Sequence, residues 1–227
     1  MNYLSFDVGI KNLAYCILTP ENKIIDWNII NLNKNPLCQV NLRKQCQNQA
    51  SYKIINEDLE YCCSSHKKKF KKVKKLNNDK DLLQLTQICL HELQLINTKG
   101  VGIVLIENQP ALKNPTMKSV QMMIYTFFIL RGVMNDNSSI TKVHMVNARN
   151  KLKIYKGTSS EMDAISCACP FNDEKKNKYK INKYLSIEYT KKMIENEDDK
   201  FKELFQESKK KDDLADSYLQ GVYWINK

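Results

Sequence analysis

Short apolar runs separated by polar turn residues dominate the first thirty positions of the chain. Residues 3–8, 13–18 and 24–31 each have the length and apolar content of a strand. The polar residues at 9–12 and 20–22 separate these runs as turns do. Three strands in such close succession predict an antiparallel meander.

Further along the chain, helical and strand patterns alternate. Residues 101–106 are continuously apolar, as in a parallel strand that is buried on both faces. Asn114 followed by Pro115 predicts the start of a helix, whereas the polar stretch 148–181 predicts irregular structure. The same periodicities predict helices over 79–97, 115–131, 182–196, 199–209 and 212–225, and a strand over 140–146. This order predicts an α/β fold with a mixed five-stranded sheet and helices packed on it.

The distribution of charge sets one segment apart from the rest of the predicted fold. The 227 residues include 36 Lys and Arg against 25 Asp and Glu, a formal net charge of +11. Residues 33–75 alone hold eleven of these basic residues and three acidic ones. We therefore predict a basic inserted module at 33–75, within a domain formed by residues 1–32 and 76–227. A basic excess favours an anionic partner, nucleic acid before a membrane surface.

Several classes of protein are disfavoured by what the sequence contains. The longest apolar run, residues 122–130, is about half of the ~20 residues that a spanning helix needs. The N-terminus lacks the basic start of a signal peptide. We expect no membrane segment and a reducing intracellular compartment, cytoplasmic or nuclear, in which the eight cysteines are thiols or metal ligands. No glycine-rich phosphate loop is visible, so no nucleotide cofactor is expected.

Four acidic residues stand out by their positions. Asp7 lies inside the first apolar run, and Glu107 ends the apolar run 101–106. Asp213 and Asp216 are one helical turn apart. If these carboxylates converge, their repulsion is relieved by hard divalent cations such as Mg²⁺ or Mn²⁺. Two such ions can hold the attacking water and the leaving oxygen of a phosphodiester. Each acid alone could instead serve a turn or a helix start, and Asp212 is a competing member of the set.

Three stretches of sequence carry a resemblance to a known family. They are FDVGIKNLAYCIL, IENQPALKNPTMKSVQMMIYTFF and KKDDLADSYLQ, which follow one another between residues 5 and 220. Together they resemble the motifs of RuvC-like Holliday junction resolvases of the ribonuclease H-like superfamily, in particular the mitochondrial and poxvirus-type branch. The resemblance implies a ribonuclease H-like fold and a metal-dependent, structure-selective endonuclease. Such an enzyme acts as a homodimer and resolves four-way DNA junctions by paired symmetric nicks in recombination, replication and repair.

The resemblance also implies roles for single residues. Asp7 would bridge two magnesium or manganese ions in each active site, Glu107 would be the ligand of the second motif, and Asp213 and Asp216 would complete the catalytic set. Lys11 is expected to contact DNA, as is Lys211 or its neighbour Lys210 near the scissile phosphate. If the chain is viral, it would act at the viral replication site.

Two other functions remain open at this point. One is a flap- or branch-selective nuclease on the same fold. The other is a zinc-containing nucleic-acid-binding protein without catalytic activity. The clustered acids favour an enzyme, because a purely binding protein gains nothing from negative charge beside DNA.

The basic module also contains candidate ligands for a structural metal. Cys38, Cys46, the pair Cys62 and Cys63, and His66 offer the thiolates and the imidazole that Zn²⁺ prefers. The module is poor in apolar residues, and such a segment often needs a metal to fold. Its spacing is not that of a common zinc finger, so free thiols in a loop are the alternative. A similar insertion in viral relatives favours a zinc site of Cys38, Cys46, Cys63 and His66.

A lysine-rich run follows these candidate ligands. Residues 67–75 read KKKFKKVKK, and we predict that they bind nucleic-acid phosphates independently of sequence. A solvated charge run and a nuclear-localisation signal are the alternatives. The lysines predicted to contact nucleic acid here are Lys67, Lys68, Lys69, Lys71 and Lys72.

Overall fold

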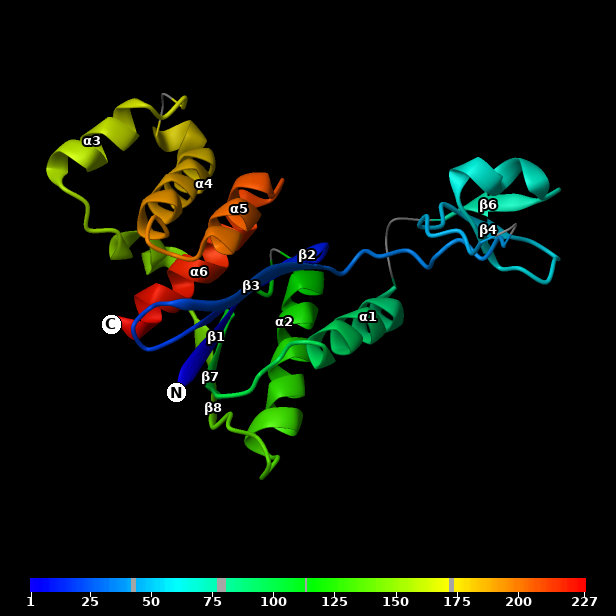
Figure 1. Cartoon of the computed structure of the whole chain (residues 1–227), viewed down its shortest axis with the longest axis horizontal. Coiled ribbons are helices and arrows are strands. Elements are labelled where there is room, and N and C mark those ends of the chain that lie inside the picture. The colour runs from blue at the N-terminus through cyan, green and yellow to red at the C-terminus, as the bar shows by residue number, and fades with distance from the viewer. Residues whose placement is uncertain (42–43, 77–80, 113, 172–173) are drawn as a thin grey trace. The chain divides into compact units, whose positions relative to one another are not determined.

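The computed structural model describes residues 1–41, 44–76, 81–112, 114–171 and 174–227 (Figure 1). The chain divides into two compact units. The larger unit comprises Met1–Ile30 and Cys89–Lys227, and the smaller unit comprises Asn31–Ile88. Among the described helices, none has the length and apolar character needed to cross a membrane.

A mixed five-stranded sheet of order β3-β2-β1-β7-β8 organises the larger unit. β1 pairs antiparallel with β2 and parallel with β7, and β7 pairs parallel with β8. The strands are β1 (Asn2–Asp7), β2 (Asn12–Leu18), β3 (Ile24–Asn31), β7 (Val101–Glu107) and β8 (Lys142–Val146). The predicted mixed sheet is therefore confirmed, including the buried parallel strand β7, which lies between β1 and β8.

Helices pack on the sheet, and their bounds correct part of the sequence-based expectation. They are α1 (Leu82–Gln94), α2 (Pro115–Phe128), α3 (Ser159–Cys167), α4 (Glu174–Met193), α5 (Asp199–Glu207) and α6 (Lys211–Ile225). The predicted cap of α2 is confirmed, because the Asn114 side chain accepts a hydrogen bond from the Met117 N–H. The same helix continues after Phe128 as the π-helical turn η2 (Ile129–Val133).

The expectation of irregular structure over 148–181 was wrong. This stretch holds the 3₁₀ helix η3 (Ala148–Ile154), all of α3 and the first part of α4. A capping box between Thr158 and Glu161 starts α3, and this local signal outweighs the absence of an apolar stripe. α4 is rich in polar residues around its whole circumference, so hydrophobic periodicity does not reveal its first half.

Alternation along β1 decides which face of the sheet carries each side chain. Phe6 contacts Phe128 of α2, with ring centroids 5.6 Å apart, whereas Ser5 faces α6 and accepts a hydrogen bond from Gln220. A Cβ on Gly221 would come within 2.6 Å of Leu18 and 3.1 Å of Ser5, so a residue without a side chain permits this close approach of α6. Asp7 therefore points to the face that α6 covers.

The core on that face is aromatic. Trp27 of β3 stacks on Phe205 of α5, with centroids 5.3 Å apart, and its indole N–H donates to the carbonyl oxygen of Leu214 at 3.1 Å. Tyr218 and Leu219 of α6 are buried in the same cluster. This packing holds α6 against the sheet.

The smaller unit has a three-stranded sheet of order β5-β4-β6. Its elements are β4 (Tyr52–Ile54), β5 (Tyr61–Cys62), β6 (Val73–Lys75) and the 3₁₀ helix η1 (Ser64–Lys69). Its buried cluster is small and contains three cysteines beside Val40 and Ile54. So small an apolar core supplies little stability by itself.

Candidate active site and metal centre

The four predicted catalytic acids line one cavity of about 560 Å³ in the larger unit. Asp7 ends β1 and Glu107 ends the neighbouring parallel strand β7, so both stand at the same edge of the sheet. Asp213 and Asp216 come from the first turns of α6. Asp213 also accepts a hydrogen bond of 3.4 Å from Asn12 at the start of β2.

Burial and neighbouring negative charge raise the pKa of three of these carboxyl groups, those of Asp7, Asp213 and Asp216. The pKa of Asp7 is well above its ordinary value because the group is buried and because Glu107 and Asp216 are negatively charged neighbours. Burial also raises the pKa of Asp216, against the opposing charge of Lys151. Burial and the nearby charge of Asp212 raise the pKa of Asp213. The cluster thus holds more negative charge than its surroundings neutralise.

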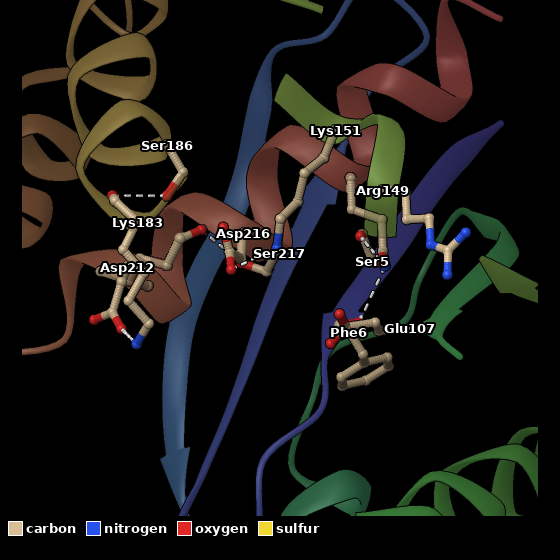
Figure 2. A network of polar contacts seen from close by, with 12 residues as sticks. Ser5, Phe6, Glu107, Arg149, Lys151, Lys183, Ser186, Asp212, Asp216 and Ser217 are labelled. Atoms are coloured by element: carbon tan, nitrogen blue, oxygen red, sulfur yellow. Dashed lines mark hydrogen bonds and ion pairs between the residues drawn. The ribbon is translucent and has the colours of Figure 1, made fainter. Parts of the chain in front are cut away.

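Lys151 enters this cluster from η3. Its ammonium lies 2.5 Å from Asp216 Oδ2, and its side chain is only 16% exposed (Figure 2). Burial lowers its pKa, but the charges of Asp216, Asp7 and Glu107 raise it more. No periodic pattern singled out this lysine, because it lies in the polar stretch 148–181, which was predicted to be irregular. In the structure this lysine pairs with Asp216 and lies within electrostatic reach of Asp7 and Glu107.

Asp212, the competing acid, faces a different partner. It forms an ion pair with Lys183 of α4 (Figure 2). Burial opposes ionisation of Asp212, but the hydrogen bond and charge of Lys183 outweigh it, so the pKa of Asp212 is lowered. The Lys183 ammonium also lies 4.9 Å from the ring centroid of Tyr179, a side chain that is 71% exposed and lines the cavity.

Other predicted contact residues lie around the same cavity. Lys11 and Lys210 line it, whereas the Lys211 ammonium donates to the Ser208 carbonyl oxygen at 3.0 Å. Gln109 is buried and donates from Nε2 to Glu107 Oε2 at 2.7 Å. Gln109 thereby orients the carboxylate of Glu107.

The donor set of the cavity fits a hard divalent cation. Its ligands are carboxylate oxygens, which Mg²⁺ and Mn²⁺ prefer. Asp216 Oδ1 is buried and has no hydrogen-bond partner among the described residues, so it has free capacity for an ion. These carboxylates are not drawn into a tight cage: within the described ranges, they do not form a set of three whose ligand atoms all lie within 4.8 Å.

The smaller unit contains such a tight set. Ligand atoms of Cys38, Cys46, Cys63 and His66 all lie within 4.8 Å of one another. His66 Nδ1 is 3.4 Å from the sulfur of Cys38 and 3.5 Å from that of Cys63, and the sulfurs of Cys46 and Cys63 are 4.0 Å apart. Cys62, the alternative ligand, lies in β5 outside this set. Three sulfurs and one imidazole match a closed structural zinc site.

The cluster itself favours a thiolate. Burial acts to raise the pKa of Cys63, but hydrogen bonds from the His66 backbone N–H and from Cys38 lower it to about 7. A thiolate is the form that binds a metal. The five lysines predicted to contact nucleic acid are exposed nearby in sequence, at residues 67–69 and 71–72, and Lys67 lies 4.7 Å from the Tyr52 ring centroid.

The strand order and the flanking helices match the ribonuclease H-like fold expected from the sequence, and the predicted acids lie at the ends of β1 and β7 and at the start of α6. A comparison with protein families identifies a more specific group of similar proteins. Residues 3–111 match the family described as mitochondrial resolvase Ydc2 and RNA splicing MRS1. A relative from Acanthamoeba polyphaga mimivirus, uncharacterized protein L451, is 29% identical in an alignment covering 99% of this chain and 74% of that protein.

Two solved resolvases have the same fold. The fowlpox virus resolvase in complex with Holliday junction DNA has a TM-score of 0.52 and 19% identity, over 100% of this chain and 97% of that chain. The yeast mitochondrial Holliday junction resolvase Ydc2 has a TM-score of 0.54 and 15% identity, over 98% of this chain and 78% of that chain. The family match and the shared fold confirm the predicted resemblance to RuvC-like resolvases of the ribonuclease H-like superfamily.

Proposed function

We propose that the protein is a structure-selective endonuclease that resolves four-way DNA junctions. The observation that supports this most strongly is the meeting of Asp7, Glu107, Asp213 and Asp216 in one cavity, on a fold shared with two Holliday junction resolvases. The acids come from three elements that are far apart in sequence, and a binding protein has no use for such a cluster of acids.

The residues of the cavity have distinct roles in this proposal. The four acids would hold two Mg²⁺ or Mn²⁺ ions, with Asp7 as their shared ligand, and such ions would supply activation of a water and stabilisation of the leaving oxygen of a phosphodiester. Lys151 neutralises Asp216 and its neighbours before ions arrive, and its buried ammonium contacts the phosphate that enters the cavity. Lys11 and Lys210 at the cavity wall hold the DNA strand. Asp212 orients Lys183 and stays outside the metal set.

The smaller unit has a supporting role in the same proposal. Cys38, Cys46, Cys63 and His66 bind one structural Zn²⁺, and the exposed lysines of η1 and the following loop contact DNA phosphates. We retain 33–75 as the inserted module and 1–32 with 76–227 as the nuclease domain. Thiolate ligands require a reducing environment. We therefore place the protein in such a compartment, at a viral replication site if its source is a virus.

Resolution of a junction needs two cuts on opposed strands. A two-fold homodimer places two copies of the cavity symmetrically and so accounts for paired nicks. The expected role lies in DNA recombination, replication and repair. No nucleotide cofactor is part of the proposed reaction.

The decisive experiment is incubation of the protein with a labelled four-way junction and with a matched linear duplex, with and without Mg²⁺. Symmetric nicking of the junction alone, in Mg²⁺ alone, is expected. The variant Asp7→Asn should bind the junction with unchanged affinity and cut it at least about 10³-fold more slowly, which corresponds to roughly 4 kcal/mol of activation free energy. Equal cutting of junction and duplex would instead indicate a less selective nuclease on the same fold.

A second candidate is nucleic-acid binding without catalysis. One observation favours it: the description of the matching family also names the RNA splicing protein MRS1. Tight binding of junction or RNA, with no cleavage in Mg²⁺ or Mn²⁺, would support this candidate and reject the first.

A further inference from the structure

One face of the small three-stranded sheet carries no part of the core. Ile54 of β4 is buried, and Tyr52 packs against the same cluster, so both lie on the inner face. Lys53 stands between them in β4 and is exposed, because successive side chains of a strand point to opposite faces. Lys53 therefore belongs to the outer face of the sheet.

The strand register extends this outer face across all three strands. Lys53 lies opposite Lys74 of β6 and, on its other side, opposite Tyr61 of β5. Lys74 is exposed and Tyr61 is half-buried. Tyr61, Lys53 and Lys74 thus form one row that runs perpendicular to the strands, which we call the outer row.

The outer row places two like charges in direct opposition. Neighbouring strands are about 4.8 Å apart, and like charges directly opposite each other in a sheet destabilise the pair. Among the described residues, the salt bridges include none to Lys53 or Lys74. This repulsion is costly for a unit with so small a core. An anion bound on the outer face would relieve it.

We propose that the outer row is a second nucleic-acid site that binds one strand of DNA. Its two lysines contact phosphates of the strand, and the Tyr61 ring packs against the adjoining base. An aromatic ring beside cations is the arrangement that single-stranded nucleic acids occupy, because every base has a face to stack and every nucleotide has a charge. The row differs from the predicted contact residues at 67–72, since β4 contributes one of its lysines and the sheet register defines it.

The site requires nucleic-acid binding but no catalysis, so it can be tested apart from the proposed nuclease activity. The full-length, zinc-loaded chain with Asp7→Asn prevents cutting. Binding of a 20-nucleotide oligo(dT) and of a labelled four-way junction is followed by fluorescence anisotropy over a range of salt concentrations, and thermal unfolding of the smaller unit is followed in parallel.

Two results are expected together for Lys53→Gln and for Lys74→Gln. Affinity for oligo(dT) falls on the order of threefold, and the slope of log affinity against log salt falls by about 0.7 for each lysine removed. At the same time each single substitution raises the unfolding temperature of the smaller unit, and the second adds less than the first because the repulsion is already gone. Lys142→Gln in β8 of the larger unit is the control for loss of one charge and should change neither property.

Three outcomes would overturn the inference. The first is unchanged affinity and salt slope in both variants. The second is a loss of affinity that Lys53→Arg fails to restore, because a phosphate contact depends on the charge. The third is binding of the outer row to an acidic protein but not to DNA. If the parent protein, without Asp7→Asn, fails to cut the junction while the lysine results hold, the nuclease proposal fails and the outer row stands.

Discussion

Each of the two units contains a cluster of side chains of the types that bind metals, and the two clusters are built in opposite ways. In the smaller unit, three cysteines and His66 already have their ligand atoms within 4.8 Å of one another. In the larger unit, the acids are more widely spread around a cavity, and Lys151 is inserted against Asp216. The first arrangement is closed and suits a metal that supports folding. The second keeps open positions and unneutralised charge, which suits ions that work together with a bound substrate.

The units also differ in what holds them together. The larger unit packs α6 and α5 on the sheet through Trp27, Phe205 and Tyr218. In the smaller unit, three of the five buried residues of the core cluster are cysteines. One unit therefore folds on apolar contacts, and the other is expected to depend on its metal. Each prediction below tests one side of this contrast.

Loss of the zinc cluster should have the largest effect. Zinc ligation in small domains contributes on the order of 10 kcal/mol to folding, so Cys46→Ser should abolish zinc binding and unfold the smaller unit. Metal analysis should find about one zinc per chain in the parent protein and none in the variant. Cys167→Ser, which alters an exposed thiol of the larger unit, is the matched control. A folded smaller unit without metal would contradict the assignment.

Truncation of the aromatic core should affect the larger unit alone. Phe205→Ala removes the ring stacked on Trp27 and should cost about 3–5 kcal/mol of unfolding free energy. Denaturant unfolding monitored by tryptophan fluorescence measures this loss, and zinc content should stay at the parent value. Loss of zinc in this variant would show that the two units do not fold independently.

Removal of one acid should stabilise the metal-free larger unit. The pKa of Asp7 is raised in the folded state, so its folded carboxyl group holds a proton that the unfolded chain releases, and stability falls as pH rises from the unfolded pKa to the folded one. Asp7→Asn lacks this charge, so at pH 7 without Mg²⁺ it should melt a few degrees above the parent protein. The difference should disappear below about pH 4, where the unfolded carboxyl is also protonated.

Magnesium supplies the control for that prediction. Added Mg²⁺ should raise the melting temperature of the parent protein and leave the Asp7→Asn variant almost unchanged. Equal responses of the two proteins would place the ion elsewhere.

The smallest effect is expected at the acid that faces away from the cluster. Asp212→Asn removes the partner of Lys183 but no proposed metal ligand, so cleavage of a junction should fall by less than about tenfold. Asp216→Asn, the comparison variant on the same helix, should reduce it by about 10³-fold or more. Equal losses in single-turnover cleavage would return Asp212 to the metal set.

The sequence predicted the larger unit best where apolar residues set the pattern. Continuous apolar runs located β1 and β7, and the acids at their ends stood out because the surrounding residues are apolar. Lys151 had no such contrast, since η3 lies in a polar stretch whose helices are defined by caps and tertiary packing. Its role follows from the three-dimensional contact with Asp216.

Side-chain contacts that depend on how the elements are oriented could not be predicted from the sequence either. Asp212 and Asp213 both lie about one helical turn before Asp216, so spacing does not separate them, and only the position of α4 decides that Asp212 meets Lys183. In the smaller unit, residue spacing left Cys62 and Cys63 equally possible, and family resemblance favoured the second. The structure makes the distinction, because β5 ends at Cys62, and Cys63, which precedes η1, has its sulfur 3.5 Å from His66 Nδ1.

Gly221 has no functional group, yet it sets the tolerance of the proposed chemistry. A single added methyl group there would meet Leu18 and Ser5 and push α6 outward from the sheet. Asp213 and Asp216 belong to the same helix. An outward shift of α6 would therefore increase the distance between their carboxylates and that of Asp7 by a similar amount. The spacing of the acids across the cavity thus depends on the missing side chain of Gly221, more than one helical turn from Asp216.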